Sequence, residues 1–260
     1  MSNSIHPTAL VSDKAVLGSG NVIGAYVIIE DGVVLGNHNT LLSGSVLKSG
    51  SELGNENTIH EHAVIGGLPQ DLGFDSKTAS YVKIGNKNTV REFVTIHRAS
   101  QKNKATTLGN ENYLMAQVHL GHDCELGNNV IIAPSSGLGG FVTVEDRAFI
   151  SGGVMVHQFV HIGSIAMLGG NAKITQDVLP YMMADGNPAH ISGLNKVGLR
   201  RAGFKVADIS AIKKAYQLLF NNESKLEKRL HALSQLDHPT SQHLTAFIHA
   251  SKRGFHRDKS

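Results

Sequence analysis

Residues 5–36 read IHPTALVSDKAVLGSGNVIGAYVIIEDGVVLG, and this stretch repeats one pattern every six residues. An aliphatic residue begins each unit, and eleven such residues follow one another without a miss as far as Ile65. After one change of phase the pattern resumes at Ile84, skips Lys102 and ends at Ile174, so that 26 positions obey it. A strict short period over this length indicates a β-solenoid, because β-sandwiches do not keep a six-residue phase.

The six-residue unit also predicts the shape of each coil. Six is an even number, so the unit preserves the alternation of a strand and points an aliphatic residue and, four positions later, usually a small residue inward. The composition agrees, because the chain has 28 Gly, no Trp and few Phe or Tyr residues. Three units would form a triangular coil of about 18 residues, and coils would stack about 4.8 Å apart by parallel pairing. We therefore expect a mainly β chain that folds as a parallel β-helix of hexapeptide repeats.

The repeat is interrupted twice, at residues 67–82 and 97–107, and both segments are polar. Insertions in a solenoid leave it as loops, often beside the functional face. The pattern ends before a segment rich in Pro and Gly, and we expect the β-helix domain to occupy residues 1–192. A C-terminal α-helical domain is predicted over residues 193–260.

Helical periodicity in this second domain predicts three helices. The first covers residues 207–220, and Ser224 with Glu227 predicts a capping box that opens the next. Pro239 precedes the last helix, at about residues 240–251.

The distribution of charge and the cysteine content indicate what kind of partner the protein binds and in which compartment it works. Residues 193–260 carry 13 Lys and Arg against 5 Asp and Glu, whereas the whole chain has a net charge of only +3. A basic helical domain suggests an acidic partner, and nucleic acid is not expected because no recognised binding motif accompanies the charge. One cysteine, no signal peptide pattern and no apolar run of about 20 residues predict a cytoplasmic protein without membrane insertion.

The strongest indication of chemistry is VHLGHDC at residues 118–124. His122 falls at a corner, and Gly140 and Gln158 should lie in the same column because each follows by about one coil. A histidine base and a backbone N–H about 5 Å apart suit attack on one carbonyl group. Asp123 would fix the tautomer of His122 and stabilise its imidazolium form.

Three further histidines, His97, His119 and His157, fall at outward-facing positions near the two breaks. A single outward histidine is most often an ordinary surface residue, but four on adjacent coils favour a site. The chain lacks a G-x-S-x-G elbow and a P-loop, and Cys124 falls at an inward position where it should pack rather than react. Direct transfer assisted by a general base is the mechanism that these observations favour.

Residues 5–204 resemble the UDP-N-acetylglucosamine O-acyltransferases, a family of hexapeptide-repeat acyltransferases whose β-helix is left-handed. The resemblance lies in specific motifs: PQDL at 69–72, VREFVTIHR at 90–98, HLGHDC at 119–124, VHQF at 156–159, GNP at 186–188 and GLRRAGF at 198–204. It implies transfer of a (3-hydroxy)acyl chain from acyl carrier protein to the 3-position of UDP-N-acetylglucosamine at the start of lipid A synthesis. It also implies a homotrimer with active sites between subunits, and no metal or cofactor.

The resemblance also implies a role for individual residues. His122 would be the general base that deprotonates the sugar 3-hydroxyl, with Asp123 behind it, and the Gly140 N–H would hold the thioester oxyanion. Gly170 matches the position that limits acyl length, and a missing side chain there leaves room for a longer chain. The substrate-binding positions of the family correspond to Gln70, Asp71, His97, His119, His157, Gln158, Asn195 and Arg201.

The chain departs from the family pattern at Phe141, Gly73, Val197 and Ala202, where the family commonly has a histidine, a lysine, an acidic and a basic residue. An altered pocket of this kind led us to one alternative, acylation of a 3-amino UDP-sugar on nitrogen. A second alternative is a γ-class carbonic anhydrase, which holds zinc with histidines between the solenoids of a trimer. Metal content would separate the zinc enzyme from the acyltransferase.

Overall fold

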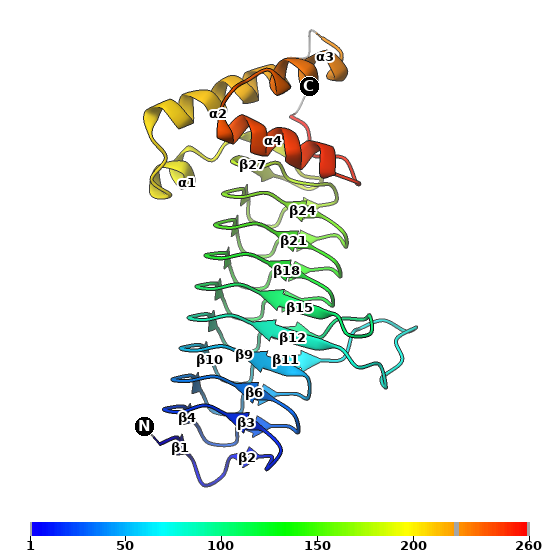
Figure 1. Ribbon diagram of the computed structural model, residues 1–260. Coiled ribbons are helices and arrows are strands. Elements are labelled where there is room, and N and C mark those ends of the chain that lie inside the picture. The colour runs from blue at the N-terminus through cyan, green and yellow to red at the C-terminus, as the bar shows by residue number, and fades with distance from the viewer. Residues whose placement is uncertain (1, 221–223, 259–260) are drawn as a thin grey trace.

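The computed structural model describes residues 2–220 and 224–258, in which a three-sided stack of parallel coils carries a group of helices at its C-terminal end (Figure 1). The chain passes from one face to the next after each short strand, so strands three apart in sequence are neighbours in one sheet.

Each face of the solenoid is one sheet. Sheet A contains β1 Ser4–Ile5, β4 Val22–Ile23, β7 Thr40–Leu41, β10 Thr58–Ile59, β13 Thr89–Val90, β16 Tyr113–Leu114, β19 Ile131–Ile132, β22 Phe149–Ile150, β25 Met167–Leu168, β27 Met182–Asp185 and β28 His190–Leu194. Sheet B contains β2 Leu10–Val11, β5 Ile28–Ile29, β8 Val46–Leu47, β11 Val64–Gly67, β14 Thr95–His97, β17 His119–Leu120, β20 Gly137–Leu138, β23 Met155–Val156 and β26 Lys173–Ile174. Sheet C contains β3 Val16–Leu17, β6 Val34–Leu35, β9 Ser51–Leu53, β12 Tyr81–Ile84, β15 Ala105–Leu108, β18 Glu125–Leu126, β21 Thr143–Val144 and β24 His161–Ile162.

The register confirms the coil predicted from the repeat. Ile5 pairs with Ile23, and His119 pairs with Gly137, so an uninterrupted coil advances by 18 residues. Every aliphatic residue of the repeat from Ile23 to Ile174 is buried in one continuous core. Ile5 remains 45% exposed because no coil lies beneath it.

The two insertions lengthen the coils that contain them. The first leaves between β11 and β12, at residues 68–80, and the second between β14 and β15, at residues 98–104. Both loops are shorter than the interruptions predicted at 67–82 and 97–107, because the strands on either side extend into the interrupted segments. The loops contact each other, since the Arg98 guanidinium donates to the Ser76 carbonyl at 2.9 Å and the Asn103 N–H donates to the Ala79 carbonyl at 2.8 Å. The first loop is the cyan excursion at the side of the solenoid in Figure 1.

The C-terminal helices are α1 Lys196–Arg201, α2 Val206–Leu219, α3 Leu226–Ser234 and α4 Pro239–Ala250. The predicted capping box of Ser224 and Glu227 is wrong, because Lys225 is the N-cap residue of α3. Glu227 is therefore the second residue of the helix, one place short of the capping-box position. A carboxylate does cap α2, where Asp208 accepts the N–H of Lys205 at 2.8 Å.

Several contacts connect the helical region to the solenoid. Beyond α4 the chain returns to the last coil, where Phe255 forms a β-bridge with Asp177. On the outer side, the carboxylate of Glu145 lies 3.1 Å from His161 Nε2 and 3.0 Å from His243 Nε2 on α4. Among the described residues, no helix is long and apolar enough to cross a lipid bilayer.

Candidate active site

One corner of the solenoid, between sheets B and C, carries the predicted column of His122, Gly140 and Gln158. The Phe141 N–H donates to the His122 carbonyl and the Phe159 N–H donates to the Gly140 carbonyl, both at 3.0 Å, so the three corners are stacked directly on one another. The predicted alignment is confirmed. The imidazole of His122 covers Gly140, because a Cβ atom added to that glycine would lie 2.5 Å from His122 Cε1.

Asp123 holds one ring nitrogen of His122. His122 Nδ1 lies 2.8 Å from Asp123 Oδ2, and the two side chains are only 17% and 8% exposed. When Nδ1 donates its proton to this carboxylate, Nε2 is left as the acceptor that faces the open side of the corner. The pair therefore has the tautomer and the charge partner that a general base needs.

The N–H of Gly140 is free to bind a ligand. Within residues 2–220 and 224–258 this N–H makes no hydrogen bond. The corner thus presents a proton acceptor and an unused backbone donor on adjacent coils. An oxyanion that forms next to His122 would find this donor already in place.

His97 and His119 lie beside this column on the outer surface of sheet B. The rings make an edge-to-face contact with centroids 4.8 Å apart, and His119 Nδ1 lies 2.8 Å from Thr95 Oγ1. Burial lowers the pKa of His97 to about 4, and burial and the nearby His122 lower the pKa of His119 as well. Both rings are therefore neutral hydrogen-bonding groups near pH 7.

The expectation that His97 is an outward, accessible residue needs correction, because its side chain is nearly buried, at 9% exposure. Strand β14 extends to His97, which pairs with Gly67 at the base of the first insertion. The ring packs against Gly67 on one side and His119 on the other. Its Nδ1 is buried and has no hydrogen-bond partner among the described residues.

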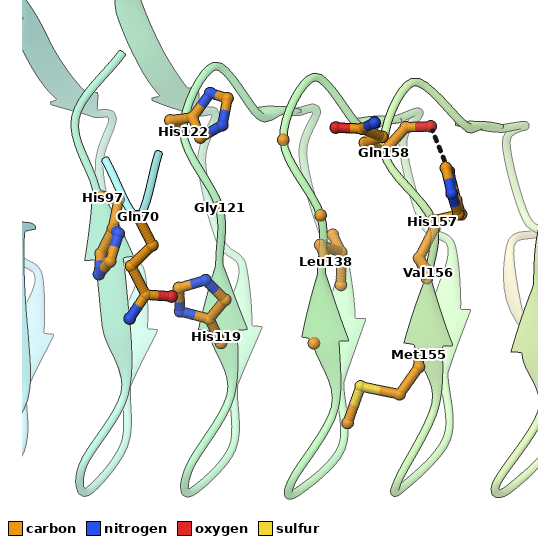
Figure 2. A pocket seen from close by; sticks show the side chains of 13 residues that line it. Gln70, His97, His119, Gly121, His122, Leu138, Met155, Val156, His157 and Gln158 are labelled. Atoms are coloured by element: carbon orange, nitrogen blue, oxygen red, sulfur yellow. Dashed lines mark hydrogen bonds between the residues drawn. The ribbon is translucent and has the colours of Figure 1, made fainter. Parts of the chain in front are cut away.

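A cavity of about 450 Å³ opens over these groups (Figure 2). Figure 2 shows His122 and Gln158 along the corner, with His97, His119 and Gln70 lower on the same face. The predicted site residues that line the cavity are Gln70, His97, His119, His122, Gly140, His157 and Gln158. The lining residues that the sequence did not indicate are Gly121, Gly137, Leu138, Gly139, Met155 and Val156. The 18-residue spacing would have located Gly137 and Met155, since they follow His119 in its column.

Five predicted residues do not line this cavity: Asp123, which contacts His122, and four others. Asp71 is exposed and accepts the N–H of Gly73 within its own loop at 2.9 Å. Asn195 is buried as the N-cap residue of α1, where its side chain accepts the Gly198 N–H and donates to the Ile165 carbonyl.

The other two are Arg201, which is exposed at the end of α1, and Gly170, which follows β25 at the corner between sheets A and B. A Cβ atom added to Gly170 would meet its nearest neighbour, the Gly152 carbonyl oxygen, at an ordinary contact distance of 3.7 Å.

The departure at Phe141 gives the cavity an aromatic border. Phe141 stacks on Phe159 with centroids 4.8 Å apart, and its ring meets the edge of His122 at 5.3 Å. An apolar ring therefore stands where the family commonly has a histidine.

Other reactive groups are remote from this chemistry or already satisfied. Cys124 is fully buried, its thiol donates to the Gly139 carbonyl at 3.2 Å, and burial raises its pKa to about 12. Among the described residues, the spacing of His60, Glu61 and Glu92 would suit a metal ion. They lie at the corner between sheets A and B, where Arg91 already pairs with Glu92 at 2.8 Å.

The chain matches two family models. Residues 105–140 match the bacterial transferase hexapeptide repeat, and residues 177–256 match the second domain of UDP-N-acetylglucosamine O-acyltransferase.

Curated relatives match over nearly the whole chain. An enzyme of Paraburkholderia phymatum named acyl-[acyl-carrier-protein]–UDP-N-acetylglucosamine O-acyltransferase is 47% identical, over 97% of this chain and 99% of its own. The enzyme of the same name from Verminephrobacter eiseniae is 44% identical, over 99% of this chain and 100% of its own.

Solved structures agree with these matches. A UDP-N-acetylglucosamine acyltransferase from Bacteroides fragilis superposes with a TM-score of 0.93 at 35% identity, over 97% of this chain and all of the other. The Francisella novicida enzyme superposes with a TM-score of 0.95 at 30% identity, over 98% of this chain and 95% of the other. Agreement at this level requires coils that wind with the same hand.

Proposed function

Since the chain belongs to the UDP-N-acetylglucosamine O-acyltransferase family, we propose that it transfers a (3-hydroxy)acyl chain from acyl carrier protein to the 3-position of UDP-N-acetylglucosamine. This reaction is the first step of lipid A synthesis. The relatives that cover the whole chain are named O-acyltransferases of UDP-N-acetylglucosamine, which favours neither the 3-amino sugar nor the zinc enzyme.

The observation that carries the mechanism is His122, held by Asp123 and placed against the free N–H of Gly140. His122 Nε2 accepts the proton of the sugar hydroxyl while that oxygen attacks the thioester carbonyl. The Gly140 N–H stabilises the negative charge that develops on the carbonyl oxygen. When the tetrahedral intermediate collapses, the C–S bond breaks and the departing thiolate takes the proton from His122. Asp123 stabilises the imidazolium between these two steps.

The neutral histidines around the base have a different role in this proposal. His97 and His119 would bind polar groups of the nucleotide sugar as neutral rings. Positively charged rings at these positions would oppose the protonation of His122 during the reaction. His157, Gln158 and Gln70 border the same cavity and would complete the polar contacts.

A homotrimer with sites between subunits would bring the remaining substrate residues to the cavity. Asp71, Asn195 and Arg201 lie outside it within one chain. Met155 and Phe159, large apolar residues beside the site, are 56% and 51% exposed and would be covered by a neighbouring subunit. Mixing inactive His122→Ala and Arg201→Ala chains tests this arrangement. Restored activity supports a shared site, and its absence in mixed trimers contradicts it.

The basic helical domain supports an acidic protein partner, and acyl carrier protein is the partner that the proposed reaction requires. We place the reaction in the cytoplasm, which the single buried and unpaired cysteine supports.

Replacement of His122 by alanine tests the proposed base. We expect the turnover number to fall by about a hundred-fold or more with the thermal stability unchanged. The matched control is His6→Ala, an exposed histidine in the first coil. Turnover within a fewfold of the parent enzyme would remove His122 from the mechanism.

A further inference from the structure

The carboxylate that supports the base is itself held in place by a third residue. Ser100 donates two hydrogen bonds to Asp123 Oδ2, from its N–H at 2.9 Å and from its Oγ at 2.7 Å. The same oxygen receives His122 Nδ1 at 2.8 Å. Asp123 Oδ2 therefore has three partners, and rotation of the carboxylate away from His122 would break all of them.

Ser100 belongs to the second insertion, residues 98–104, and the strand that follows this insertion also contacts Asp123. Thr106, on β15, is fully buried and its Oγ1 accepts the Asp123 N–H at 2.8 Å. Asp123 has a φ of 59°, the left-handed conformation that Phe141 and Phe159 also adopt at the second position of their corners. Thr106 thus holds the backbone of Asp123, and Ser100 holds its side chain.

Among the described residues the same pair of hydrogen bonds occurs twice more: Ser164 donates its N–H and its Oγ to Glu145 Oε2, and a second case lies far from the active site. Ser49 donates its N–H and its Oγ to Glu30 Oε2 at 3.0 and 3.4 Å, among the N-terminal coils. There the third partner of the carboxylate is Lys48, at 3.1 Å, rather than a histidine. Ser49 consequently offers the same chemical change, loss of a serine hydroxyl from a carboxylate, without any connection to His122.

We propose that Ser100 is a positioning residue that fixes the carboxylate of Asp123 and, through it, the orientation of the His122 ring. This inference rests on the proposed role of His122 as the general base. With the carboxylate fixed, Nδ1 donates to Asp123 throughout the reaction and Nε2 stays directed at the sugar hydroxyl. The second insertion is thereby part of the catalytic apparatus although it contributes no atom that touches the substrate.

The test compares Ser100→Ala, Ser100→Thr and Ser49→Ala in the full chain. For Ser100→Ala we expect kcat to fall about tenfold, the loss of one hydrogen bond to a charged group, with KM for both substrates unchanged. The acidic limb of its pH–rate profile should move to higher pH, because a carboxylate with one donor fewer attracts the imidazolium more strongly. His97 and His119 also face His122, and burial lowers the pKa of both rings from the ordinary value of histidine.

Ser100→Thr keeps the hydroxyl and should restore both kcat and the pH profile. Ser49→Ala should leave both unchanged, even where its unfolding temperature falls by as much as that of Ser100→Ala. A merely structural role of Ser100 would lower stability without moving the pH profile.

Two results separate this inference from the proposed function. If His122→Ala is inactive while Ser100→Ala keeps the parent kcat and pH profile, the positioning role is wrong and the base assignment stands. If His122→Ala retains its turnover, both are wrong.

Discussion

The distance between Gly140 and His122 allows the proposed geometry to be tested with one methyl group. A Cβ atom at residue 140 would lie 2.5 Å from Cε1 and 2.7 Å from Nε2 of His122, whereas ordinary contacts begin at 3.4 Å. The backbone at Gly140 is not in the left-handed region, so the collision with the ring is the main consequence of Gly140→Ala. The ring must retreat by about 1 Å, and a displacement of this size costs roughly a hundred-fold in rate.

The retreat would also strain the contact between His122 Nδ1 and Asp123, which is 2.8 Å long. We therefore expect kcat/KM of Gly140→Ala to fall by about a hundred-fold, while binding of UDP-N-acetylglucosamine in a direct titration changes little. The assay follows release of the free thiol from acyl carrier protein over a range of sugar concentrations.

Gly152→Ala provides the matched control. Gly152 is also the first residue of a corner, but an added Cβ atom there meets its nearest neighbour, the Pro134 carbonyl oxygen, at an ordinary 3.4 Å. This variant should retain the parent activity and unfolding temperature. Activity of Gly140→Ala within about threefold of the parent enzyme would refute the reasoning, because the reaction would then tolerate a ring displaced from its observed position.

Three further outcomes follow from the structure. Glu145→Gln should destabilise the protein at pH 7 by about 1–3 kcal/mol, because it removes the charge that pairs with His161 and His243. These hydrogen bonds hold the pKa of Glu145 well below its usual range, so the stabilisation by its carboxylate is complete above about pH 4.5 and is lost as the pH falls. Denaturant titrations should therefore show a smaller difference in stability between the parent protein and Glu145→Gln at pH 3 than at pH 7. The pKa of His97 is lowered to about 4 in the folded protein, so between about pH 6.5 and 4 the unfolded chain binds a proton that the folded chain does not bind. The parent protein therefore loses stability as the pH falls through this range, and His97→Gln should lose less, by at most about 1.4 kcal/mol per pH unit. An equal loss of stability in both proteins would contradict this. Gly170→Met should fold normally, since a Cβ atom at residue 170 meets its nearest neighbour at an ordinary 3.7 Å. It should shift the preferred donor to a shorter acyl chain in a competition between acyl carrier proteins analysed by mass spectrometry, and an unchanged preference would separate Gly170 from chain-length selection.

The spacing of residues along the sequence was enough to determine the coil and the central column of the site. In a solenoid each residue is placed by its neighbours one coil away, so a count of 18 residues locates Gly140 beside His122. The inward position of Cys124 follows from the same period, and the adjacency of Asp123 to His122 follows from the chain itself.

Only the tertiary structure decided what the two insertions do. They change the offset between paired residues from 18 to 31 and then to 24, so that counting no longer locates a neighbour. The burial of His97 against Gly67 and the hydrogen bonds from Ser100 to Asp123 both depend on where these loops return to the solenoid. The pairing of Glu145 with His243 depends in the same way on how α4 packs on the last coils. A local period specifies contacts that recur at a fixed separation, whereas contacts made by loops and docked helices occur once and depend on the packing of the whole chain.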